Sequence, residues 1–540
     1  MEKLFLRFLF LTTIGWHTLE AQIVPSIEWQ KCFGGITTEM ANSVQQTSDG
    51  GYIAAGVTYS NDGDVSGWHV GYDNYGDPLP DYWIVKLDVA GNLVWQKCLG
   101  GSDIDVATSI QPTMDGGFIV AGYSESNDGD VSGNHGGNYG ATYDYWIVKL
   151  DTDVNVAWQK SLGGSYNDVA TSIQQGIDGG YIVAGYVRSN DGDVSGNHGD
   201  FDYWIVKLDP VGNLAWQKCL GGGNYEEAYS IQQTSDSGFI VVGTSRSNGG
   251  DVSGNNGVYD YWIVKLNFVG NLIWQKSLGG STGEKAYSVQ QTIDNGFIVA
   301  GYSASTDSDV SGNHGFHDEW IVKLDSGGNL EWQKSLGGSN YEEAYSIQQT
   351  SDDGFLVAGW SESDDGDVSG NHGNGDIWVI KLDTNGNLVW QKCLGGTNGD
   401  GASSIRQTID GGFIVAGYSL SDDVDVSGNH GGSDFWLVKL SSDIPTGTAS
   451  SSNNSISLFP NPVQNILTIN LSSAYATASI AVYDVAGRKI VLPTTVSNNK
   501  TQLNTTTLPN GIYMVHVINN SQSSAGKTGV SEVGKLVKEQ

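Results

Sequence analysis

Short runs of alternating hydrophobic and polar residues recur along most of the chain, and turn signals separate them. In residues 228–280, four such runs, rich in Val, Ile, Tyr and Trp, follow one another at 228–234, 238–245, 260–266 and 271–280. Asp-Ser-Gly marks the first turn and Gly-Asn marks the last. Alternation with a period of two predicts strands, and these turn residues predict tight hairpins. We therefore expect a four-stranded antiparallel meander, which cannot bury both of its faces alone.

The same unit occurs seven times. One series of tryptophans lies in Trp-Gln-Lys, and a second series lies shortly before Lys-Leu and advances by 58 residues each time from Trp146 onward. The first series is Trp29, Trp95, Trp158, Trp216, Trp274, Trp332 and Trp390, and the second is Trp83, Trp146, Trp204, Trp262, Trp320, Trp378 and Trp436. We expect both series to pack one repeat against the next, as in stacked repeat arrays.

The two ends of the array predict that it closes into a ring. The chain begins with a lone fourth strand at 27–33, and the array ends after a third strand at 434–440 with no Trp-Gln-Lys run behind it. Pairing these two segments would complete the last sheet and leave no exposed sheet edge. The prediction is an all-β fold with a seven-bladed β-propeller over residues 22–440, closed by its N-terminal strand.

Residues 27–440 resemble β-propeller repeats of the WD type in strand number and repeat length, although the Gly-His and Trp-Asp signature of those repeats is missing. Runs such as LGGS followed by DGGFIVAGYS are more similar to propeller repeats of secreted bacterial proteins. This resemblance implies a fold and does not indicate an activity.

Composition narrows the class of partner. The chain has 540 residues with 75 Gly and only 10 Pro, and its formal net charge is −34. This charge argues against nucleic acid and anionic membranes as partners, because those are bound by clustered Lys and Arg. It favours solubility or cation binding.

The cysteines share one repeat position. Cys32, Cys98, Cys219 and Cys393 all follow Trp-Gln-Lys, where the other copies have Ser. Equivalent positions in separate repeats lie too far apart for a disulfide, so free, half-buried thiols are expected.

Residues 1–21 combine a charged start at Lys3, a short apolar run and a small residue at Ala21. This pattern predicts a secretory signal peptide that is cleaved after Ala21. No later segment has the roughly 18 consecutive apolar residues of a membrane-spanning helix. We therefore expect a mature protein without a transmembrane segment, and a monomer.

Successive turns of a meander alternate between the two ends of its strands. The long connections between second and third strands should therefore share one face with the links between blades, and tight hairpins should fill the other face. Seven loops related to SNDGDVSGNHG, the sequence at 189–199, would gather many carboxylates on the first face. Cations relieve such repulsion.

Four of these loops follow the spacing of a calcium-binding loop. With Asp191 as position 1, Asp193 takes position 3, Ser195 position 5 and Asp202 position 12, so that oxygens at odd positions and a final carboxylate would face one ion. The same spacing gives Asp307, Asp309, Ser311 and Asp318; Asp365, Asp367, Ser369 and Asp376; and Asp423, Asp425, Ser427 and Asp434. Ser at position 5, Asp at position 12 and the lack of expected flanking helices depart from the EF-hand. The alternative is ordinary turn chemistry, in which Asp, Asn and Ser bond to nearby amides.

Histidines recur at one position of the loops, namely His135, His198, His314, His372 and His430. Asn256 in the fourth copy and GWHV in the first interrupt the series. Propeller symmetry would space these rings around a circumference, so we expect solvated loop histidines rather than a shared metal site.

The first two copies break the symmetry. From the second-strand Gly to the third-strand Trp, the chain advances 27 residues in the first copy, 24 in the second and 19 in the third. Insertions into a repeat map to loops on a binding face. We expect the aromatic residues there to be exposed and to stack against a sugar or a peptide; they are Trp68, His69, Tyr72, Tyr75, Tyr139 and Tyr143. The alternative is that the two longer loops only pack on each other.

No catalytic residue is predicted. A glycosidase or lyase needs two carboxylates in different environments, and near-identical copies supply identical environments. The sequence contains no Ser-His-Asp order, no HExxH and no phosphate-binding glycine loop.

After a small polar linker at 441–455 the repeat pattern ends and a different sequence pattern begins. Residues 456–540 alternate as short strands with Pro and Gly turns, which predicts a small β-sandwich. This tail closely resembles the C-terminal sorting domain of the type IX secretion route of Gram-negative bacteria, through Pro460-Asn461-Pro462, Tyr483-Asp484, Gly487-Arg488, Leu508-Pro509-Asn510-Gly511-Ile512-Tyr513 and Lys535. The resemblance implies that the secretion machinery recognises the tail, and that the protein is then attached to the cell surface or released.

These observations predict a secreted or surface-attached binding or adhesion module. Calcium is the candidate cofactor, and a glycan or a surface protein is the candidate partner. The alternatives are a carbohydrate-active enzyme on a propeller scaffold and a structural surface protein without a ligand.

Overall fold

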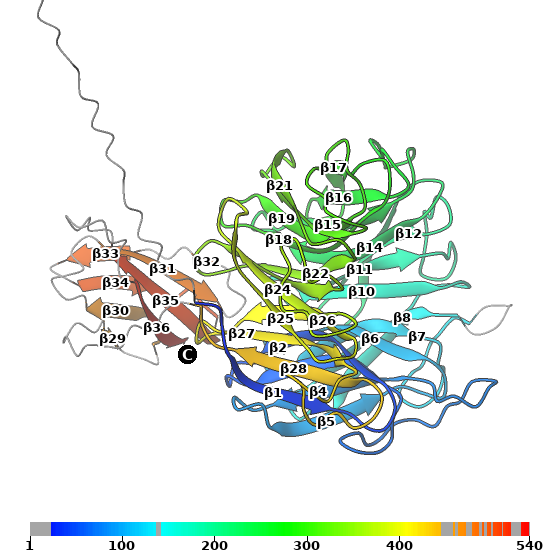
Figure 1. The fold of residues 1–540 in the computed structure, drawn as a ribbon. Helices are drawn as coiled ribbons and strands as arrows, with labels where there is room; N and C mark the ends of the chain where they lie inside the picture. Colours follow the sequence, from blue (N-terminus) through cyan, green and yellow to red (C-terminus); the bar gives the residue numbers. More distant parts are fainter. Residues whose placement is uncertain are drawn as a thin grey trace, which may run out of the picture.

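The computed structural model describes residues 23–136, 142–443 and, in the tail, 457–459, 463–470, 478–484, 489–490, 494–497, 500–509, 511–519 and 531–538. The described elements are β-strands (Figure 1). The predicted signal peptide and Tyr139 lie outside the described residues. Within those ranges no helix has the length and apolarity needed to cross a membrane.

Seven antiparallel sheets of four strands form a ring of blades. Blade 1 is β2 (Glu39–Gln46), β3 (Tyr52–Thr58), β4 (Asp81–Leu87) and β5 (Leu93–Leu99); blade 2 is β6 (Asp105–Pro112), β7 (Phe118–Ser124), β8 (Asp144–Leu150) and β9 (Val156–Leu162); blade 3 is β10 (Asp168–Gln175), β11 (Tyr181–Val187), β12 (Asp202–Leu208) and β13 (Leu214–Leu220); blade 4 is β14 (Glu226–Gln233), β15 (Phe239–Ser245), β16 (Asp260–Leu266) and β17 (Leu272–Leu278). Blade 5 is β18 (Glu284–Gln291), β19 (Phe297–Ser303), β20 (Asp318–Leu324) and β21 (Leu330–Leu336); blade 6 is β22 (Glu342–Gln349), β23 (Phe355–Ser361), β24 (Asp376–Leu382) and β25 (Leu388–Leu394); blade 7 is β26 (Asp400–Gln407), β27 (Phe413–Ser419), β28 (Asp434–Leu440) and β1 (Ile27–Phe33).

The ring closes between its two ends. β1 pairs antiparallel with β28, with Lys31 opposite Leu437, and so becomes the fourth strand of blade 7. The indole N–H of Trp436 donates a hydrogen bond to the side-chain oxygen of Gln30 at 2.9 Å. The prediction of a seven-bladed propeller closed by its N-terminal strand is confirmed.

Large apolar side chains join neighbouring blades. The third-strand tryptophans are fully buried. The hydroxyl of Tyr82 donates to the carbonyl of Trp146 in the next blade at 2.9 Å, and the two rings lie 4.5 Å apart. The first strands of neighbouring blades contact one another, which places them around the central axis. These tryptophans therefore serve packing between blades, as the repeat predicts.

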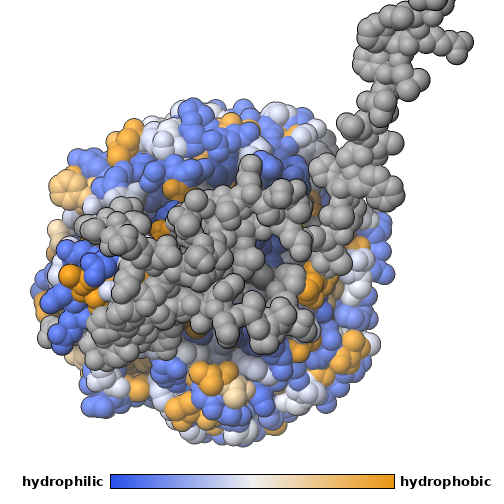
Figure 2. Space-filling model, turned by 90° about the vertical axis from the view of Figure 1, so that its left-hand side faces the viewer, coloured by the Kyte–Doolittle hydropathy of each residue, from blue (hydrophilic) through white to orange (hydrophobic). Residues whose placement is uncertain are grey.

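Every blade has a Lys–Asp ion pair on the hairpin face, as between Nζ of Lys86 and Oδ2 of Asp49 at 2.9 Å. Blades 5 and 7 add the ion pairs Lys323–Glu331 and Lys439–Glu28. Figure 2 views the side of the molecule that lies on the left in Figure 1, and hydrophilic residues predominate among its coloured atoms. Apolar residues are exposed singly at several hairpins, such as Val89 and Met114, and as a neighbouring pair, Phe268 and Val269, at the turn between β16 and β17. Single exposed residues of this kind need no functional explanation.

All four cysteines are free, as expected. The expectation that their thiols are half-buried is wrong, because they are only 6–8% exposed. They belong to apolar clusters of the propeller, as Cys98 does beside Trp83 and Val85.

The tail is also built from strands. One sheet has the order β29 (Ser457–Phe459), β30 (Ile466–Asn470), β34 (Lys500–Asn504) and β33 (Thr494–Ser497), and the other has the order β32 (Lys489–Ile490), β31 (Ala478–Asp484), β35 (Gly511–Asn519) and β36 (Ser531–Lys538). Leu467 and Leu503 of the first sheet share a buried cluster with Val482 and Val515 of the second.

Candidate functional site

The long loop of each blade clamps the link that leads into that blade. In blade 3, Oδ1 of Asp191 accepts a hydrogen bond from the N–H of Ser165 at 2.8 Å, and the N–H of Asp193 donates to the carbonyl of Gly163 at 2.8 Å. Gly192 between them has a φ of +64°, and a Cβ there would collide with the Gly163 carbonyl. Glycine adopts this conformation without strain, although Ser308 and Val424 take the same position in blades 5 and 7, each with a φ of +57°. Loops and links share one face, as the meander predicts.

Most side chains predicted to hold calcium contact a neighbouring protein group, and for Asp425 the contact is made by its backbone N–H, which donates to the carbonyl of Gly395 at 3.2 Å. In blade 3 the partners are Ser165 for Asp191, His135 for Asp193, Gln217 for Ser195 and His198 for Asp202. Equivalent contacts are made by Asp307, Ser311 and Asp318, by Asp365, Ser369 and Asp376, and by Asp423, Ser427 and Asp434. Among the described residues, no group of three or more His, Cys, Asp or Glu side chains could hold a metal ion. The contacts are those of turn chemistry, and calcium binding stays a prediction.

The loop histidines are anchored to buried carboxylates. Nδ1 of His198 lies 2.6 Å from Oδ2 of Asp202, and the backbone N–H of His198 donates to the same oxygen at 3.0 Å. The same pairing occurs in His135–Asp144, His314–Asp318, His372–Asp376 and His430–Asp434. The histidines are solvated in part: their side chains are 30–43% exposed, while an aspartate holds one ring nitrogen of each.

The first and fourth blades complete this series in different ways. His69 of the inserted loop also places Nδ1 2.8 Å from Oδ2 of Asp81, although the insertion puts the two residues twelve positions apart in sequence. In blade 4, Asn256 contributes its backbone N–H to Oδ2 of Asp260 at 2.8 Å. The interruption inferred from GWHV is thus only apparent, whereas that at Asn256 is real.

Each anchored aspartate faces a second buried carboxylate across a glycine. A Cβ on Gly100 would lie 2.7 Å from Oδ1 of Asp81 and 2.6 Å from Oδ2 of Asp105, and both aspartates are buried. The seven pairs are Asp81–Asp105, Asp144–Asp168, Asp202–Glu226, Asp260–Glu284, Asp318–Glu342, Asp376–Asp400 and Asp434–Glu39. Oδ1 of the first aspartate in every pair has no hydrogen-bond partner among the described residues.

Burial raises the pKa of Asp202, Asp260, Asp318, Asp376 and Asp434, and the charge of the facing carboxylate adds to the rise. Burial, with a smaller contribution from Glu226, raises the pKa of Asp202 to about 6. The pKa of Asp260 rises to about 7 through burial and the charge of Glu284. Two carboxylates held together out of water favour a shared proton. The pairs are alike in all blades and closed to a substrate, so they bear on stability rather than catalysis.

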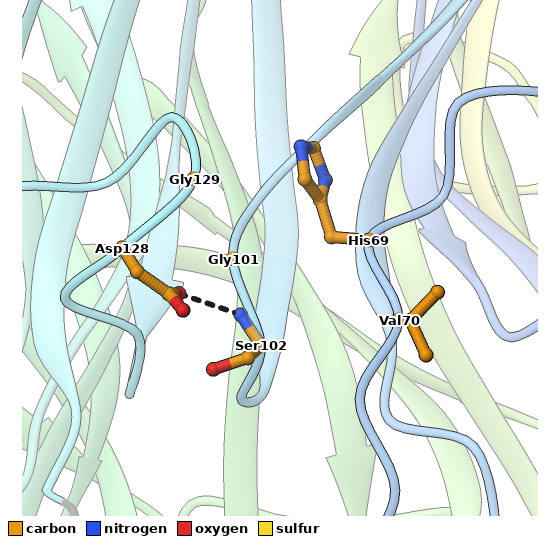
Figure 3. A pocket seen from close by; sticks show the side chains of 6 residues that line it. All are labelled: His69, Val70, Gly101, Ser102, Asp128 and Gly129. Carbon is orange, nitrogen blue, oxygen red and sulfur yellow. Dashed lines mark hydrogen bonds between the residues drawn. The ribbon is translucent and has the colours of Figure 1, made fainter.

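A hollow of about 190 Å³ lies between the inserted loop of blade 1 and the facing loops of blade 2 (Figure 3). Its lining residues are His69 and Val70 of the inserted loop, Gly101 and Ser102 of the link, and Asp128 and Gly129 of the β7–β8 loop. The N–H of Ser102 donates to Oδ1 of Asp128 at 2.7 Å. Nε2 of His69 lies 3.7 Å from Oδ2 of Asp130. An imidazole, a hydroxyl and a carboxylate therefore meet beside an apolar side chain.

The inserted loop also presents two tyrosines to solvent. Tyr72 is 58% exposed and Tyr75 is 92% exposed. Oδ1 of Asp73 accepts the N–H groups of Tyr75 and Asp77 at 2.8 and 2.9 Å, which fixes the turn that carries Tyr75. The expected exposure of these two rings is therefore present in the structure.

Trp68 has a different position from the one expected. It is only 9% exposed, its indole N–H donates to the carbonyl of Leu79 at 2.8 Å, and its ring packs in the apolar cluster of blade 1. The expectation that Trp68 is exposed is wrong, because the ring anchors the inserted loop.

Tyr143, one of the two tyrosines predicted from blade 2, does not line the hollow. Tyr143 is half-buried and packs against Tyr123 with 4.8 Å between the ring centres. Tyr139 lies outside the described residues. Val70, Ser102 and Asp128 were not anticipated, because link and loop residues look alike in every copy, and only the insertion gives this junction a hollow.

Comparison with a protein family identifies the tail. Residues 457–531 match the secretion system C-terminal sorting domain. The tail is a type IX sorting domain, as its motifs predict, and the protein is exported by that route and is attached to the cell surface or released.

Comparisons with individual proteins concern the propeller. The regulatory protein FlaEY of Caulobacter vibrioides is 26% identical over 161 residues, which are 29% of this chain and 16% of that protein, so the chain spans a small part of that relative. Sqt1 from Chaetomium thermophilum is 10% identical, with a TM-score of 0.39 over 76% of this chain and 99% of that one. A puromycin hydrolase is 10% identical, with a TM-score of 0.41 over 81% of this chain and 59% of that one. Likeness at this level carries no functional argument.

Proposed function

We propose that the protein is a saccharide-binding module of the cell surface, and that it takes its ligand on the loop-rich face at the junction of blades 1 and 2. The observation that supports this most is the coincidence of the longest loop, the exposed rings of Tyr72 and Tyr75 and the polar hollow beside His69. Binding sites combine flat apolar surfaces with a few fixed polar groups that orient the ligand.

The polar groups of the hollow suit the hydroxyl groups of a sugar. Nε2 of His69, the hydroxyl of Ser102 and the carboxylate of Asp128 supply donors and acceptors around the hollow. The side chains of His69 and Asp128 are already fixed by hydrogen bonds within the protein. Nδ1 of His69 lies 2.8 Å from Oδ2 of Asp81, and Oδ1 of Asp128 accepts the N–H of Ser102 in the link. Groups that are already ordered cost less entropy when a ligand binds.

Export by the type IX route brings this face to the outside of the cell, where surface glycans and polysaccharides are available ligands. A surface protein that carries glycans would be recognised through the same chemistry. Calcium, the ion predicted for the acidic loops, is the candidate stabiliser of this face, and the protein acts as a monomer.

A glycan array probed with the secreted protein tests the proposal. We expect binding that weakens at least tenfold, about 1.4 kcal/mol, in a Tyr72→Ala/Tyr75→Ala variant whose melting temperature is unchanged. Phe268→Ala is the matched control, because Phe268 is 65% exposed on the hairpin face. Unchanged affinity in the double tyrosine variant would contradict the proposed site.

Two further measurements separate the remaining possibilities. A melting temperature that falls on addition of a chelator supports the calcium prediction, whereas an unchanged value contradicts it. Release of soluble sugar from a bound glycan would favour the carbohydrate-active enzyme, and we expect none.

A further inference from the structure

The basic residues of the propeller are unevenly placed. In residues 23–443 every Lys and Arg follows Trp-Gln or precedes Leu at a repeated position, except Arg188, Arg246, Lys285 and Arg406. Arg406 bonds to the carbonyl of Ile405 in blade 7 at 2.7 Å. The other three lie at the loop-rich ends of blades 3, 4 and 5.

These three cations are joined by aromatic rings into one continuous surface. The guanidinium of Arg188 lies 5.9 Å from the ring centre of Phe201, and that ring lies 5.5 Å from Tyr225 of the next blade. Arg246 lies 5.7 Å from the ring centre of Tyr225 and 4.6 Å from that of Tyr259. Nζ of Lys285 lies 5.7 Å from Tyr259. We call these six residues, Arg188, Phe201, Tyr225, Arg246, Tyr259 and Lys285, the cation–aromatic ladder.

The two arginines of the ladder are exposed, Lys285 is 25% exposed, and all three charges are weakly paired. The Arg188 side chain is 51% exposed and lies 3.9 Å from Asp200, and Lys285 lies 3.8 Å from Glu227, both beyond hydrogen-bond distance. Arg246 is exposed, and no described carboxylate lies within ion-pair distance of it. A guanidinium stacked on a ring keeps its N–H edge free for an anion.

The fold does not require these residues. The position of Arg188 and Arg246 directly follows the second strand, and the other blades place Tyr59, Glu125, Ala304, Glu362 and Leu420 there. A side chain without charge, and even an acidic one, is therefore compatible with the same local structure. Two adjacent arginines at this position point to a ligand rather than to folding.

We propose that the cation–aromatic ladder is a second binding site, which holds an acidic polysaccharide across blades 3–5. The arginines and Lys285 bind the acid groups, and the rings of Phe201, Tyr225 and Tyr259 lie against the flat faces of the sugars. This site is separate from the hollow beside His69, and it does not depend on the function proposed for that hollow.

A uronic acid polymer fits the ladder better than other polyanions. Each of its sugars presents a flat C–H face and a carboxylate, so it uses rings and guanidinium groups together. An acidic peptide has no flat apolar face, and a nucleic acid needs a larger cluster of cations for its phosphates. The net charge of −34 does not prevent contact, because charges farther away than about 8 Å are screened at physiological ionic strength.

Binding of the secreted protein to polygalacturonate, measured beside its fully methyl-esterified and hence neutral form, tests the proposal. We expect clear binding to the acid and at least tenfold weaker binding to the ester, because a charge-assisted bidentate pair is lost. Arg188→Ala/Arg246→Ala should weaken binding to the acid by about tenfold or more. Ala304 occupies the same position in blade 5, so this variant is expected to fold.

The controls separate this site from the hollow and from general charge effects. Glu362→Ala alters the same position in blade 6 and should leave binding to polygalacturonate undiminished, as should Tyr72→Ala/Tyr75→Ala. Absence of binding to polygalacturonate, equal binding of the ester, or full affinity in a folded Arg188→Ala/Arg246→Ala variant would each overturn the proposal. Equal binding of polyglutamate or of single-stranded DNA would overturn the assignment to saccharides.

Discussion

Oδ2 of Asp202 is held by Nδ1 of His198 at 2.6 Å, while the other oxygen of the same buried carboxylate faces Glu226 and has no hydrogen-bond partner among the described residues. A pair of buried carboxylates of this kind stands between every two neighbouring blades, and a histidine holds the first aspartate of each pair except Asp260. The stability of the ring is therefore coupled to protonation.

The melting temperature should fall as the pH rises from about 5 to about 8. Asp202, Asp260 and Asp376 have pKa values of about 6, about 7 and about 6 in the folded protein, raised chiefly by burial. An unfolded Asp has a pKa of about 3.9. The folded state thus binds more protons than the unfolded chain between about pH 4 and pH 7, and the free energy of unfolding decreases across this window.

His69 acts in the same direction, because its hydrogen bond to Asp81 raises its pKa and this stabilisation is lost at higher pH. We expect a decrease of about 5 °C or more between the two pH values, measured by calorimetry. A melting temperature that increases from about pH 5 to about pH 8 would show that the carboxylate pairs do not hold protons in the folded state.

Asp260→Asn should stabilise the propeller at about pH 8. In blade 4 no histidine holds Asp260, so the change costs no ion pair. Its amide oxygen can accept the N–H of Asn256, and its NH₂ group can donate to Glu284 at the place of the unpartnered Oδ1. We expect the free energy of unfolding to increase by about 1 kcal/mol, measured by denaturant titration.

Asp202→Asn is the matched comparison for that change. It makes the same new contact with Glu226 but removes the carboxylate that holds Nδ1 and the backbone N–H of His198, so its gain should be smaller or negative. If Asp260→Asn destabilises the protein at about pH 8, the unpartnered oxygen does not face an ionised carboxylate.

A disulfide should form between Ser26→Cys and Ser441→Cys. The two hydroxyl oxygens lie 3.4 Å apart, and the N–H of Ser441 donates to the carbonyl of Ser26 at 2.8 Å. The cross-link would lock the closure of the ring and raise the melting temperature, with an upper limit of about 5 kcal/mol from chain entropy. Mass spectrometry of the cleaved protein detects the linked peptides.

Each single variant serves as the control for the cross-link, because the native thiols are buried. Two free thiols at these positions after oxidation would show that the ends of the ring are not adjacent.

The native thiols should resist alkylation at about pH 8. Burial raises the pKa of Cys32 to about 12, and the other three thiols are equally buried, so little reactive thiolate is present. We expect no iodoacetamide adduct on the folded protein and four adducts after denaturation, counted by mass spectrometry. Modification of a thiol in the folded protein would contradict the burial of these side chains.

The fold could be predicted because the repeated strands and turns determine how the sheets are built and how the ring closes. The lone strand at 27–33 and the last strand of the repeat array at 434–440 have one economical arrangement, in which Lys31 comes to lie opposite Leu437. The turn residues likewise indicated which connections are long and which are tight. All of this rests on local patterns, which a single sequence carries well.

The candidate site could be predicted only in part. The insertion in the first copy indicated the junction of the proposed site. The alternation of hydrophobic and polar residues predicts strands but not the conformation of a loop, so the sequence did not show that Trp68 turns inward to the carbonyl of Leu79. Pairs such as Asp81–Asp105 come from different blades, and their contact depends on the angle between blades rather than on sequence spacing. The ladder from Arg188 to Lys285 was missed for the same reason.

Hydrogen–deuterium exchange with a glycan identified on the array tests most directly whether the loop-rich face of blades 1 and 2 is the binding face. We predict that bound ligand slows amide exchange in residues 66–80, in the link 100–103 and in the loop 126–130, and leaves the hairpins at 47–51 and 113–117 unchanged. Protection of the hairpins, or of the links of other blades instead of 100–103, would contradict the account.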